Sequence, residues 1–153
     1  GRKVNLSGNL TGFRERENIL IYETKKEKEF LPVKIKCNQK IGVNDKIFSI
    51  NIRDKKEIEL NEEKNREFIS ADKTEDYFIL RRWKEGDRFN PLGLKGTKNV
   101  SDFLNEQKIP SSEKNKQLVL TNKNRIVWIV GLRIDEKFKI TNNTKKVYEL
   151  CLN

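Results

Sequence analysis

The chain has 153 residues, of which 35% are hydrophobic and 37% charged, and it carries a formal net charge of +10 with no histidine. This length suits one ordinary domain or two small lobes that share a core, and it leaves no room for a catalytic domain of usual size as well. The lack of histidine excludes Ser-His-Asp triads, Cys-His nucleophiles and zinc-finger spacing, and no apolar run is long enough for a membrane span or a secretory signal.

Residues 1–76 are expected to form short strands separated by charged turns, because stretches such as KIFSINI alternate apolar with polar side chains as half-buried strands do. The expected strands are VNL at 4–6, ILIY at 19–22, FLPVKIKC at 30–37, KIFSINI at 46–52 and EIEL at 57–60. Turns are expected at Gly12, at Gly42 with Asn44 and Asp45, and at Asn61. The pattern predicts no helix in this half of the chain.

From Phe78 onward the pattern changes to a strand, a glycine-rich loop, a helix and then further strands. FILRRW at 78–83 predicts a strand, and EGDRFNPLGLKG at 85–96 predicts a loop whose glycines permit tight turns. NVSDFLNEQKIP at 99–110 predicts a short helix, capped by Asn99 or Ser101 and ended by Pro110, and SSEKNK at 111–116 predicts one more helical turn. The strands expected after it are LVLTN at 118–122, RIVWIVGLRI at 125–134, FKI at 138–140 and KKVYELCL at 145–152.

This order of elements predicts an α+β fold in which antiparallel sheets dominate, with one or two short helices in the carboxyl-terminal half. We expect a strand-rich amino-terminal lobe at 1–76 and a second domain at 77–153. The polar stretch Ser70–Asp76 is the expected seam between them.

The positive charge is concentrated in the second half of the chain. Residues 1–76 hold 17 Lys or Arg against 15 Asp or Glu, a net charge of +2, whereas residues 77–153 hold 16 against 8, a net charge of +8. Six of these cations fall in LRRWKEGDRFNPLGLKGTK at 80–98, where only Glu85 and Asp87 oppose them. Glycines there would leave backbone N–H groups facing an anion, and the following helix would point its amino terminus the same way. A polyanion, nucleic acid before membrane, is the favoured partner over a loop that is merely solvated.

Catalytic interpretations of the same loop fail. G-L-K-G-T-K at 93–98 lacks the spacing of a phosphate-binding loop. Asp87 and Asp102 could be taken as a carboxylate pair, but Asp87 stands between Gly86 and Arg88, where it is expected to form a turn and an ion pair with a neighbouring arginine. We therefore predict no catalytic residue and no metal ligand in this chain.

Two tryptophans and two cysteines leave smaller questions. Trp128, inside IVWIV, is expected in the core, whereas Trp83 is open between base stacking, a cation–π contact and covering the core edge. Cys37 and Cys151 are expected as buried free thiols of a reducing cytosol, although a disulfide between them stays open.

The chain contains no methionine. Either an initiator methionine was removed or the chain is a piece of a larger protein, and we favour the second explanation. We expect it to be cytoplasmic.

The ordered motifs of the second half resemble a known family. GDRFNPLGLKGTKNVSDFLNEQKIP at 86–110, VLTNKNRIVWIVGLRIDEKFKIT at 119–141 and the closing KKVYEL at 145–150 are similar to the carboxyl-terminal domain of bacterial tRNA(Ile)-lysidine synthetases. The resemblance covers about residues 78–152, and residues 1–77 match only in outline. The positions that carry the motif are Arg81, Gly86, Asp87, Arg88, Gly93, Gly96, Lys98, Ile109, Pro110, Glu113, Gly131 and Arg133.

The resemblance implies a role in modifying tRNA. The family enzyme uses ATP to adenylate the wobble cytidine of an isoleucine tRNA with a CAU anticodon, and free lysine then displaces AMP to form lysidine. That chemistry, with ATP and Mg²⁺, belongs to an amino-terminal domain of the PP-loop type with an SGGxDS motif, which is absent here. The resemblance also implies sandwich-like sheets, and it implies that this chain holds the tRNA without a cofactor of its own.

The resemblance and the cationic loop together predict the residues that contact RNA. After Ile109-Pro110 the family often has an aromatic or basic pair and then arginines, whereas this chain has Ser111, Ser112 and two lysines, which cannot reproduce a bidentate fork. The expected RNA-binding residues are Arg81, Arg82, Lys84, Arg88, Lys95, Lys98, Lys114, Lys116 and Arg133. The expected partners are that tRNA, the catalytic domain and, as an open question, a second copy of the chain. The alternative is a docking or dimerisation domain whose basic face is incidental.

Overall fold

The computed structural model describes residues 3–5, 10–15, 18–23, 29–59 and 63–153, and it divides the chain into two compact units, Gly1–Phe30 and Leu31–Asn153. The first unit holds an antiparallel three-stranded sheet of β1 (Lys3–Asn5), β2 (Leu10–Glu15) and β3 (Asn18–Glu23). Gly12, which was expected at a turn, lies instead in the middle of β2, where it pairs with Val4 and Ile21. Leu6, at the end of the first expected strand, and Asn61, an expected turn, lie outside the described residues.

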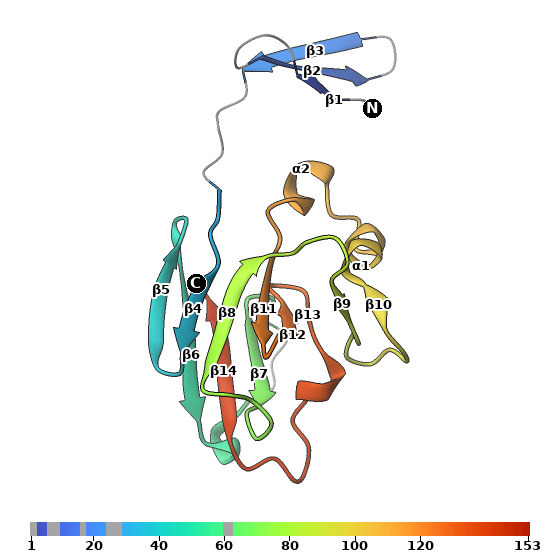
Figure 1. Ribbon diagram of the computed structural model, residues 1–153. Helices are drawn as coiled ribbons and strands as arrows, with labels where there is room; N and C mark the ends of the chain where they lie inside the picture. Colours follow the sequence, from blue (N-terminus) through green and yellow to red (C-terminus); the bar gives the residue numbers. More distant parts are fainter. Residues whose placement is uncertain (1–2, 6–9, 16–17, 24–28, 60–62) are drawn as a thin grey trace. The chain divides into compact units, whose positions relative to one another are not determined.

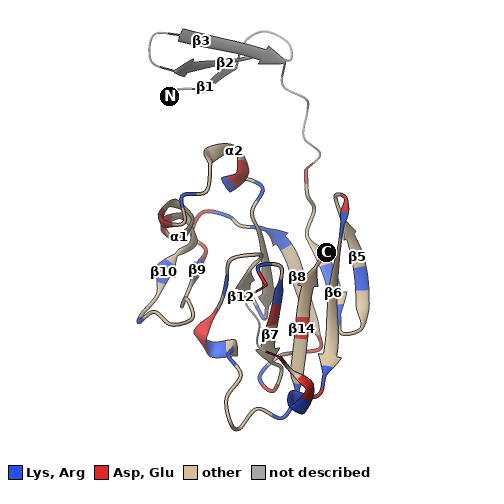
Figure 2. Ribbon diagram, turned by 180° about the vertical axis from the view of Figure 1, so that it is seen from behind, with Lys and Arg blue, Asp and Glu red and all other residues tan. Residues whose placement is uncertain are grey.

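The second unit is built from two antiparallel sheets, which Figures 1 and 2 show from opposite sides. The five-stranded sheet contains, in sequence order, β4 (Val33–Lys36), β8 (Tyr77–Arg82), β11 (Leu118–Asn122), β12 (Arg125–Ile129) and β13 (Arg133–Ile134). The four-stranded sheet contains β5 (Gln39–Val43), β6 (Lys46–Arg53), β7 (Arg66–Ser70) and β14 (Val147–Leu152), with β14 between β6 and β7. A two-stranded ribbon of β9 (Arg88–Phe89) and β10 (Lys98–Asn99) leads into the helices α1 (Val100–Glu106) and α2 (Ser111–Lys114). The α+β, antiparallel class with sandwich-like sheets is thus confirmed.

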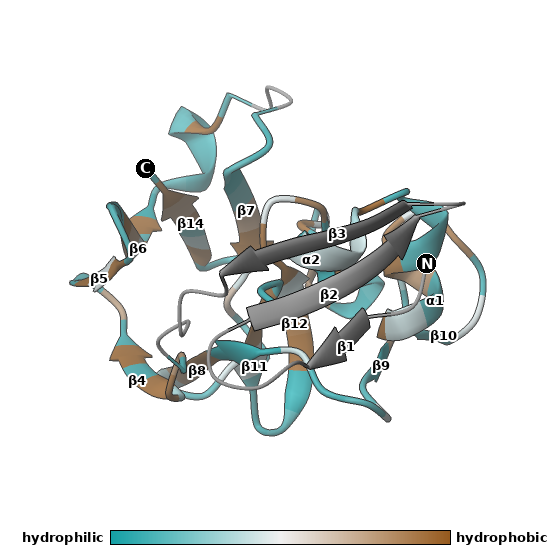
Figure 3. Cartoon of the chain, turned by 90° about the horizontal axis from the view of Figure 1, so that it is seen from above, coloured by the Kyte–Doolittle hydropathy of each residue, from teal (hydrophilic) through white to brown (hydrophobic). Residues whose placement is uncertain are grey.

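The two sheets bury a common core. Phe48 of the four-stranded sheet lies 6.2 Å, between ring centroids, from Trp128 of the five-stranded sheet, and Phe78 lies 5.9 Å from Tyr148. Trp128 is fully buried, which confirms its expected place in the core. Figure 3 shows the hydrophobic stretches of strands such as β12 and β14, and their burial supplies the main driving force for folding.

A second cluster lies on the other face of the five-stranded sheet, beneath α1. Phe103 of α1 packs against Phe89 with ring centroids 5.1 Å apart, and Val119 and Ile129 from β11 and β12 complete the floor. Because side chains alternate across a strand, Val119 faces α1 while its neighbour Leu120 faces the sandwich interior. The helix is therefore anchored on the sheet, and the loop before it is anchored with it.

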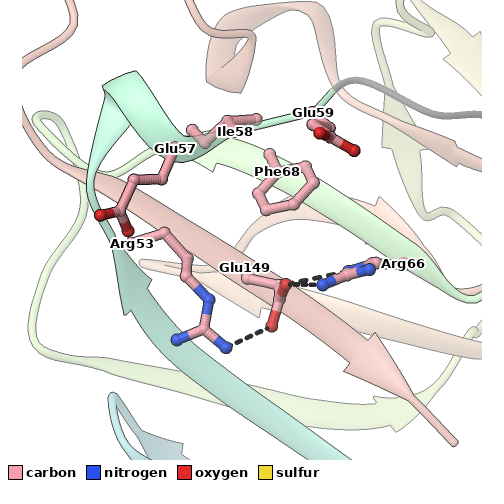
Figure 4. A pocket seen from close by; sticks show the side chains of 7 residues that line it. All are labelled: Arg53, Glu57, Ile58, Glu59, Arg66, Phe68 and Glu149. Carbon is pink, nitrogen blue, oxygen red and sulfur yellow. Dashed lines mark hydrogen bonds and ion pairs between the residues drawn. The ribbon is translucent and has the colours of Figure 1, made fainter.

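The outer face of the four-stranded sheet buries one carboxylate. Glu149 of β14 is 4% exposed and lies between two arginines, with Arg53 Nη2 3.0 Å from Oε1 and Arg66 Nη2 2.6 Å from Oε2. The hydrogen bond to Glu149, and then its charge, raise the pKa of the Arg66 guanidinium. Figure 4 shows this cluster at the side of a cavity of about 160 Å³ that Glu57 and Phe68 also line. The cluster joins β6, β14 and β7 across the sheet.

The division of the chain differs from the two-lobe prediction of 1–76 and 77–153. Strands from before residue 76 pair with strands from after it in both sheets of the second unit: β4 with β8, and β6 and β7 with β14. The seam expected at Ser70–Asp76 therefore lies inside one compact unit, and the observed division falls after Phe30. The sequence cannot reveal such pairing, because the alternation of apolar and polar residues predicts that a segment is a strand but not which other strand it pairs with.

Several local predictions were wrong for reasons of turn chemistry. Residues 57–59, the described part of EIEL, and FKI do not form strands; each stretch begins with the last residue of a short 3₁₀ turn, Lys55–Glu57 or Glu136–Phe138. Each turn is capped by an aspartate, Asp54 or Asp135, whose side chain accepts a hydrogen bond from the backbone N–H two residues later. β2, β5 and β7 were not predicted, whereas LVLTN matches β11.

The structure also tests the predictions made for the helices and the cysteines. The helix expected at 99–110 is shorter, and Asn99 occupies its cap position without a side-chain capping hydrogen bond. The expected extra turn after Pro110 is α2. Both cysteines are free thiols, with Cys151 buried and Cys37 only half-buried. Over the ranges that the structure describes, no helix is both long enough and apolar enough to cross a bilayer.

Candidate functional site

The cationic segment at 80–98, called the cationic loop below, leaves the end of β8 and leads back into α1. Within it, β9 and β10 pair antiparallel, with Phe89 opposite Lys98 and Arg88 opposite Asn99. Gly93 and Gly96 have φ angles of 82° and 86°, in the left-handed region that glycine adopts without strain, and so the chain can reverse between the two strands. The loop is consequently a folded element with a defined shape.

Asp87 holds the first turn of the loop. Its carboxylate accepts hydrogen bonds from Arg81 Nη1 at 2.8 Å, from Arg81 Nη2 at 3.0 Å and from the Lys84 backbone N–H at 2.8 Å. Both partners are largely buried, with side chains 18% exposed for Arg81 and 8% for Asp87. The expected role of Asp87 in a turn and an arginine ion pair is confirmed, although its partner is Arg81, six residues earlier, and not the adjacent Arg88. The bidentate pair fixes where the loop leaves β8.

Two carboxylates from a distant part of the sequence hold the other end of the loop. Asp135 Oδ2 accepts a hydrogen bond from the Asn90 backbone N–H at 2.8 Å, and Glu136 Oε2 accepts one from the Gly93 backbone N–H at 3.0 Å. The Leu92 N–H donates to the Ile134 carbonyl at 3.0 Å. The expectation that the glycines leave these N–H groups facing an anion is thus wrong at Gly93, because an internal carboxylate accepts its hydrogen bond.

The Glu136 contact gives the loop a pH dependence. The hydrogen bond from Lys139, and then the one from the Gly93 N–H, hold the pKa of Glu136 below its ordinary value of about 4.3. The Gly93 hydrogen bond should therefore persist above that ordinary value and break only as the pH falls through the lowered folded-state pKa. An NMR titration should show the Gly93 amide shifting in that acidic range. Glu136→Gln should abolish the titration, and an unchanged titration in E136Q would contradict this origin.

The expected helix-terminus contribution to anion binding is weaker than predicted. The first helical N–H, that of Val100, donates to the Asp87 carbonyl at 2.9 Å and so points into the protein. With seven residues, α1 is also too short to develop a large macrodipole. The electrostatic attraction of this region must therefore come chiefly from side chains.

The nine predicted RNA-binding residues fall into two groups. Lys84, Arg88 and Lys95 are exposed and Arg82 is half-buried, and within the described part of the chain their side chains make no hydrogen bond or ion pair. These cations come from one loop and the strand end that leads into it. They are the predicted residues best placed to attract an anion.

The other predicted cations contact the protein. Arg81 is paired with Asp87, and Lys98 with Glu106 of α1. The Arg133 guanidinium lies 5.5 Å from the centroid of the Phe103 ring. Lys116 is exposed and lines a different hollow, beside Pro110 and the turn between β5 and β6. The structure therefore does not bring all nine cations to one surface.

Lys114 and Trp83 contact each other directly. Lys114 Nζ donates to Asn105 Oδ1 at 2.8 Å and lies 5.5 Å from the centroid of the Trp83 ring, while Trp83 Nε1 donates to the Lys114 carbonyl at 2.6 Å. Trp83 also packs on the cluster beneath α1. Of the roles left open for Trp83, it covers the core edge and makes a cation–π contact.

Sequence reasoning missed two cations and two carboxylates of this region. Arg125 and Lys137 line an open cleft together with Arg88, and Asp135 and Glu136 hold the loop from the far side. The asparagine at 124 is a local signal for the turn that presents Arg125. No local signal shows that residues near 88, 125 and 137 meet. Figure 2 shows the basic residues of this side of the unit in blue.

Comparisons with known proteins agree on one family. The family model described as "TilS substrate C-terminal domain" matches residues 78–151. The tRNA(Ile)-lysidine synthase of Clostridium acetobutylicum is 35% identical over 158 residues, which cover 98% of this chain and 34% of that protein. The one from Caldanaerobacter subterraneus subsp. tengcongensis is 40% identical over 80 residues, which cover 52% of this chain and 17% of that protein. The chain thus spans about a third or less of these relatives.

A solved structure supports the fold. A chain described as "Crystal structure of TILS C-terminal domain" superposes with a TM-score of 0.68 at 15% identity and covers 80% of this chain and 97% of its own length. At this identity the likeness shows the fold alone. The superposed part of the chain is longer than residues 78–151, which the family model matches. This agrees with the pairing of strands from before residue 78 into both sheets.

Proposed function

Because residues 78–151 belong to the family of TilS substrate C-terminal domains, we propose that this chain is the tRNA-holding part of a tRNA(Ile)-lysidine synthase. Its task is to bind isoleucine tRNA with a CAU anticodon, so that a catalytic part elsewhere in the enzyme attaches lysine to the wobble cytidine. ATP and Mg²⁺ act in that catalytic part. In the portion of the chain that the structure describes, no group of three or more His, Cys, Asp or Glu side chains is arranged to hold a metal ion.

The observation that carries the proposal is the cationic loop, whose neighbouring carboxylates are hydrogen-bonded to the loop backbone while several of its cations face solvent. Asp87, Asp135 and Glu136 accept hydrogen bonds from the loop backbone, while Lys84, Arg88 and Lys95 extend into solvent. Arginine offers a planar fork and lysine a point charge to phosphate oxygens. The hydrogen bonds to the loop backbone fix the points from which these cations extend, which lowers the entropy cost of ordering them on binding.

The binding energy in this proposal is mostly electrostatic. If about four to six phosphates are contacted, the logarithm of the binding constant falls with the logarithm of the salt concentration with a slope of about −3 to −5. The backbone contacts set the position of the tRNA and carry no sequence information directly. Choice of the correct tRNA therefore depends on other parts of the enzyme as well as this loop.

Charge reversal of the exposed loop cations tests the proposal. The triple variant Lys84→Glu, Arg88→Glu and Lys95→Glu is expected to bind the tRNA transcript about 10–100-fold more weakly in filter retention, because it removes cations that neutralise phosphates and adds repulsion. Arg81 is left unchanged, since its guanidinium holds Asp87. The salt dependence should become shallower by about one for each phosphate that the variant no longer neutralises.

A matched control separates the loop from net charge. Lys36→Glu, Lys40→Glu and Lys46→Glu make the same charge change at exposed positions on and beside β5, at the other side of the unit in Figure 1. This control is expected to retain most of the affinity. Equal losses of affinity in both triple variants would reject the loop as the binding surface. Failure of the unsubstituted chain to retain tRNA at low salt, together with sedimentation as a dimer, would instead favour a docking or dimerisation domain.

A further inference from the structure

A cleft of about 250 Å³ opens beside the cationic loop. The loop contributes Arg88 and Thr97 to its lining, the β11–β12 hairpin contributes Asn124 and Arg125, and the segment after β13 contributes Lys137. Its floor is apolar and buried, made of Phe89, Ile126 and Phe138. Three segments that are distant in sequence thus surround one opening.

Three exposed cations and one buried carboxylate also line this cleft. Arg88, Arg125 and Lys137 make no side-chain hydrogen bond or ion pair with the residues that the structure describes. Asp135 is buried, and its two carboxylate oxygens accept the backbone N–H groups of Asn90 and Lys137, each at 2.8 Å. The cleft therefore has a net charge of +2, and its one anion is turned into the protein.

The remaining lining suits an oxyanion. Asn90 and Asn124 carry side-chain amides, and the Thr97 hydroxyl donates to Asn90 Oδ1 at 2.7 Å, which leaves the Asn90 amide nitrogen as a donor. Arg125 directly follows a tight turn in which Lys123 and Asn124 have φ angles of 51° and 60°. Cations around neutral donors, above an apolar floor, match a tetrahedral oxyanion better than a metal ion or an apolar ligand.

We propose that Arg88, Arg125 and Lys137 form a binding site for a phosphate group, occupied by a backbone phosphodiester of RNA. The inference rests on the proposed function and deepens it, because it carries the RNA path past the loop to the β11–β12 hairpin and the segment after β13. The mouth of the site is open, so that a phosphate within a chain can enter with its two neighbours outside. Arg125 and Lys137 then act with Arg88 as one site.

The test removes charge at two positions that the loop experiment leaves untouched. Arg125→Gln and Lys137→Gln, singly and together, are compared with Lys123→Gln by filter retention of the tRNA transcript over a series of salt concentrations. Lys123 is the matched control because it lies on the same hairpin turn, outside the cleft, with its Nζ 3.5 Å from Glu75. All of these substitutions are at exposed positions, and circular dichroism with thermal melting checks that the fold is retained.

The double variant is expected to bind about tenfold more weakly, with a salt slope shallower by about one, whereas K123Q stays within about twofold of the unsubstituted chain. If the unsubstituted chain binds tRNA and the double variant does not differ from K123Q, the site is rejected and the proposed function stands. If the unsubstituted chain does not bind tRNA, both fail.

In a second experiment, inorganic phosphate is titrated at constant ionic strength while the Thr97 and Asn124 amides are followed by NMR. Tight, saturable binding of phosphate that tRNA does not displace would identify a free-anion site and overturn the proposal.

Discussion

Replacing Asp87 by alanine is expected to lower the free energy of unfolding by about 3 kcal/mol, because the Arg81 guanidinium loses its counter-charge in a largely buried position. The figure lies at the lower end of the range for broken buried ion pairs, since the Arg81 side chain keeps 18% of its exposure to water. The Lys84 N–H also loses its acceptor, so the first turn of the loop opens. Urea denaturation of the variant gives the free energy directly.

The same variant separates loop shape from loop charge. Removing a carboxylate makes the chain more positive, which by itself would strengthen tRNA binding. D87A is nevertheless expected to bind tRNA more weakly, because the cations of the loop lose their fixed positions. Glu85→Ala, an exposed carboxylate in the same turn, is the matched control and should bind as well as the unsubstituted chain or slightly better.

A double-mutant cycle identifies the cause of the D87A effect. Arg81→Met combined with Asp87→Ala removes both charges, and it should recover part of the stability lost in D87A because no unpaired guanidinium remains. Additive losses of stability from the two substitutions would show that the pair is not coupled. A loss below about 1 kcal/mol in D87A alone would contradict the structural role assigned to this carboxylate.

Replacing Glu149 by glutamine is expected to cost about 2 kcal/mol of stability while leaving tRNA binding unchanged. The carboxylate is buried between Arg53 and Arg66, and the neutral amide cannot balance either guanidinium. The cost is discounted from the range for fully buried pairs, because the two arginine side chains are 43% and 36% exposed and water screens their charge. Chemical denaturation measures the change in stability, and filter retention measures the binding.

Glu57 provides the comparison for this second substitution. Its exposed carboxylate lines the same cavity as Glu149 but has no bond to either arginine. Glu57→Gln should change the stability by less than about 0.5 kcal/mol. An equal effect of E57Q and E149Q would mean that general charge in the cavity matters rather than the pairing. Weaker tRNA binding by E149Q would extend the RNA surface to the four-stranded sheet, against the present proposal.

The sequence predicted best those elements whose local pattern agrees with their final surroundings. LVLTN is mostly apolar and contains the β-branched Val119 and Thr121, and it becomes β11, a strand inside a sheet. FKI has a similar pattern, but Asp135 before it offers its side chain to the backbone and a 3₁₀ turn results. Gly12 and Gly42 were taken as turn residues, although both lie in strands that are paired through their backbones.

The candidate site was predicted as a loop but not as a surface. The density of cations from 81 to 98 is a local property, and so is the pairing of Asp87 with an arginine six residues away. The restraint of Gly93 by Glu136, and the meeting of Arg88 with Arg125 and Lys137, depend on interactions between distant segments that no local pattern encodes. RNA binding by the nine predicted cations stays a prediction, for which the geometry now distinguishes solvent-facing side chains from those engaged within the protein.

The position of β14 has a consequence for synthesis on the ribosome. This strand is the last of the unit in sequence, yet it lies between β6 and β7 and joins them. The four-stranded sheet can therefore close only after Val147–Leu152 have left the exit tunnel, so β6 and β7 each lack a neighbour until then. A nascent product that stops short of this strand would expose unpaired β6 and β7 edges, which are templates for aggregation. Quality-control proteases would then meet such a product as an unfinished sheet rather than as a smaller stable domain.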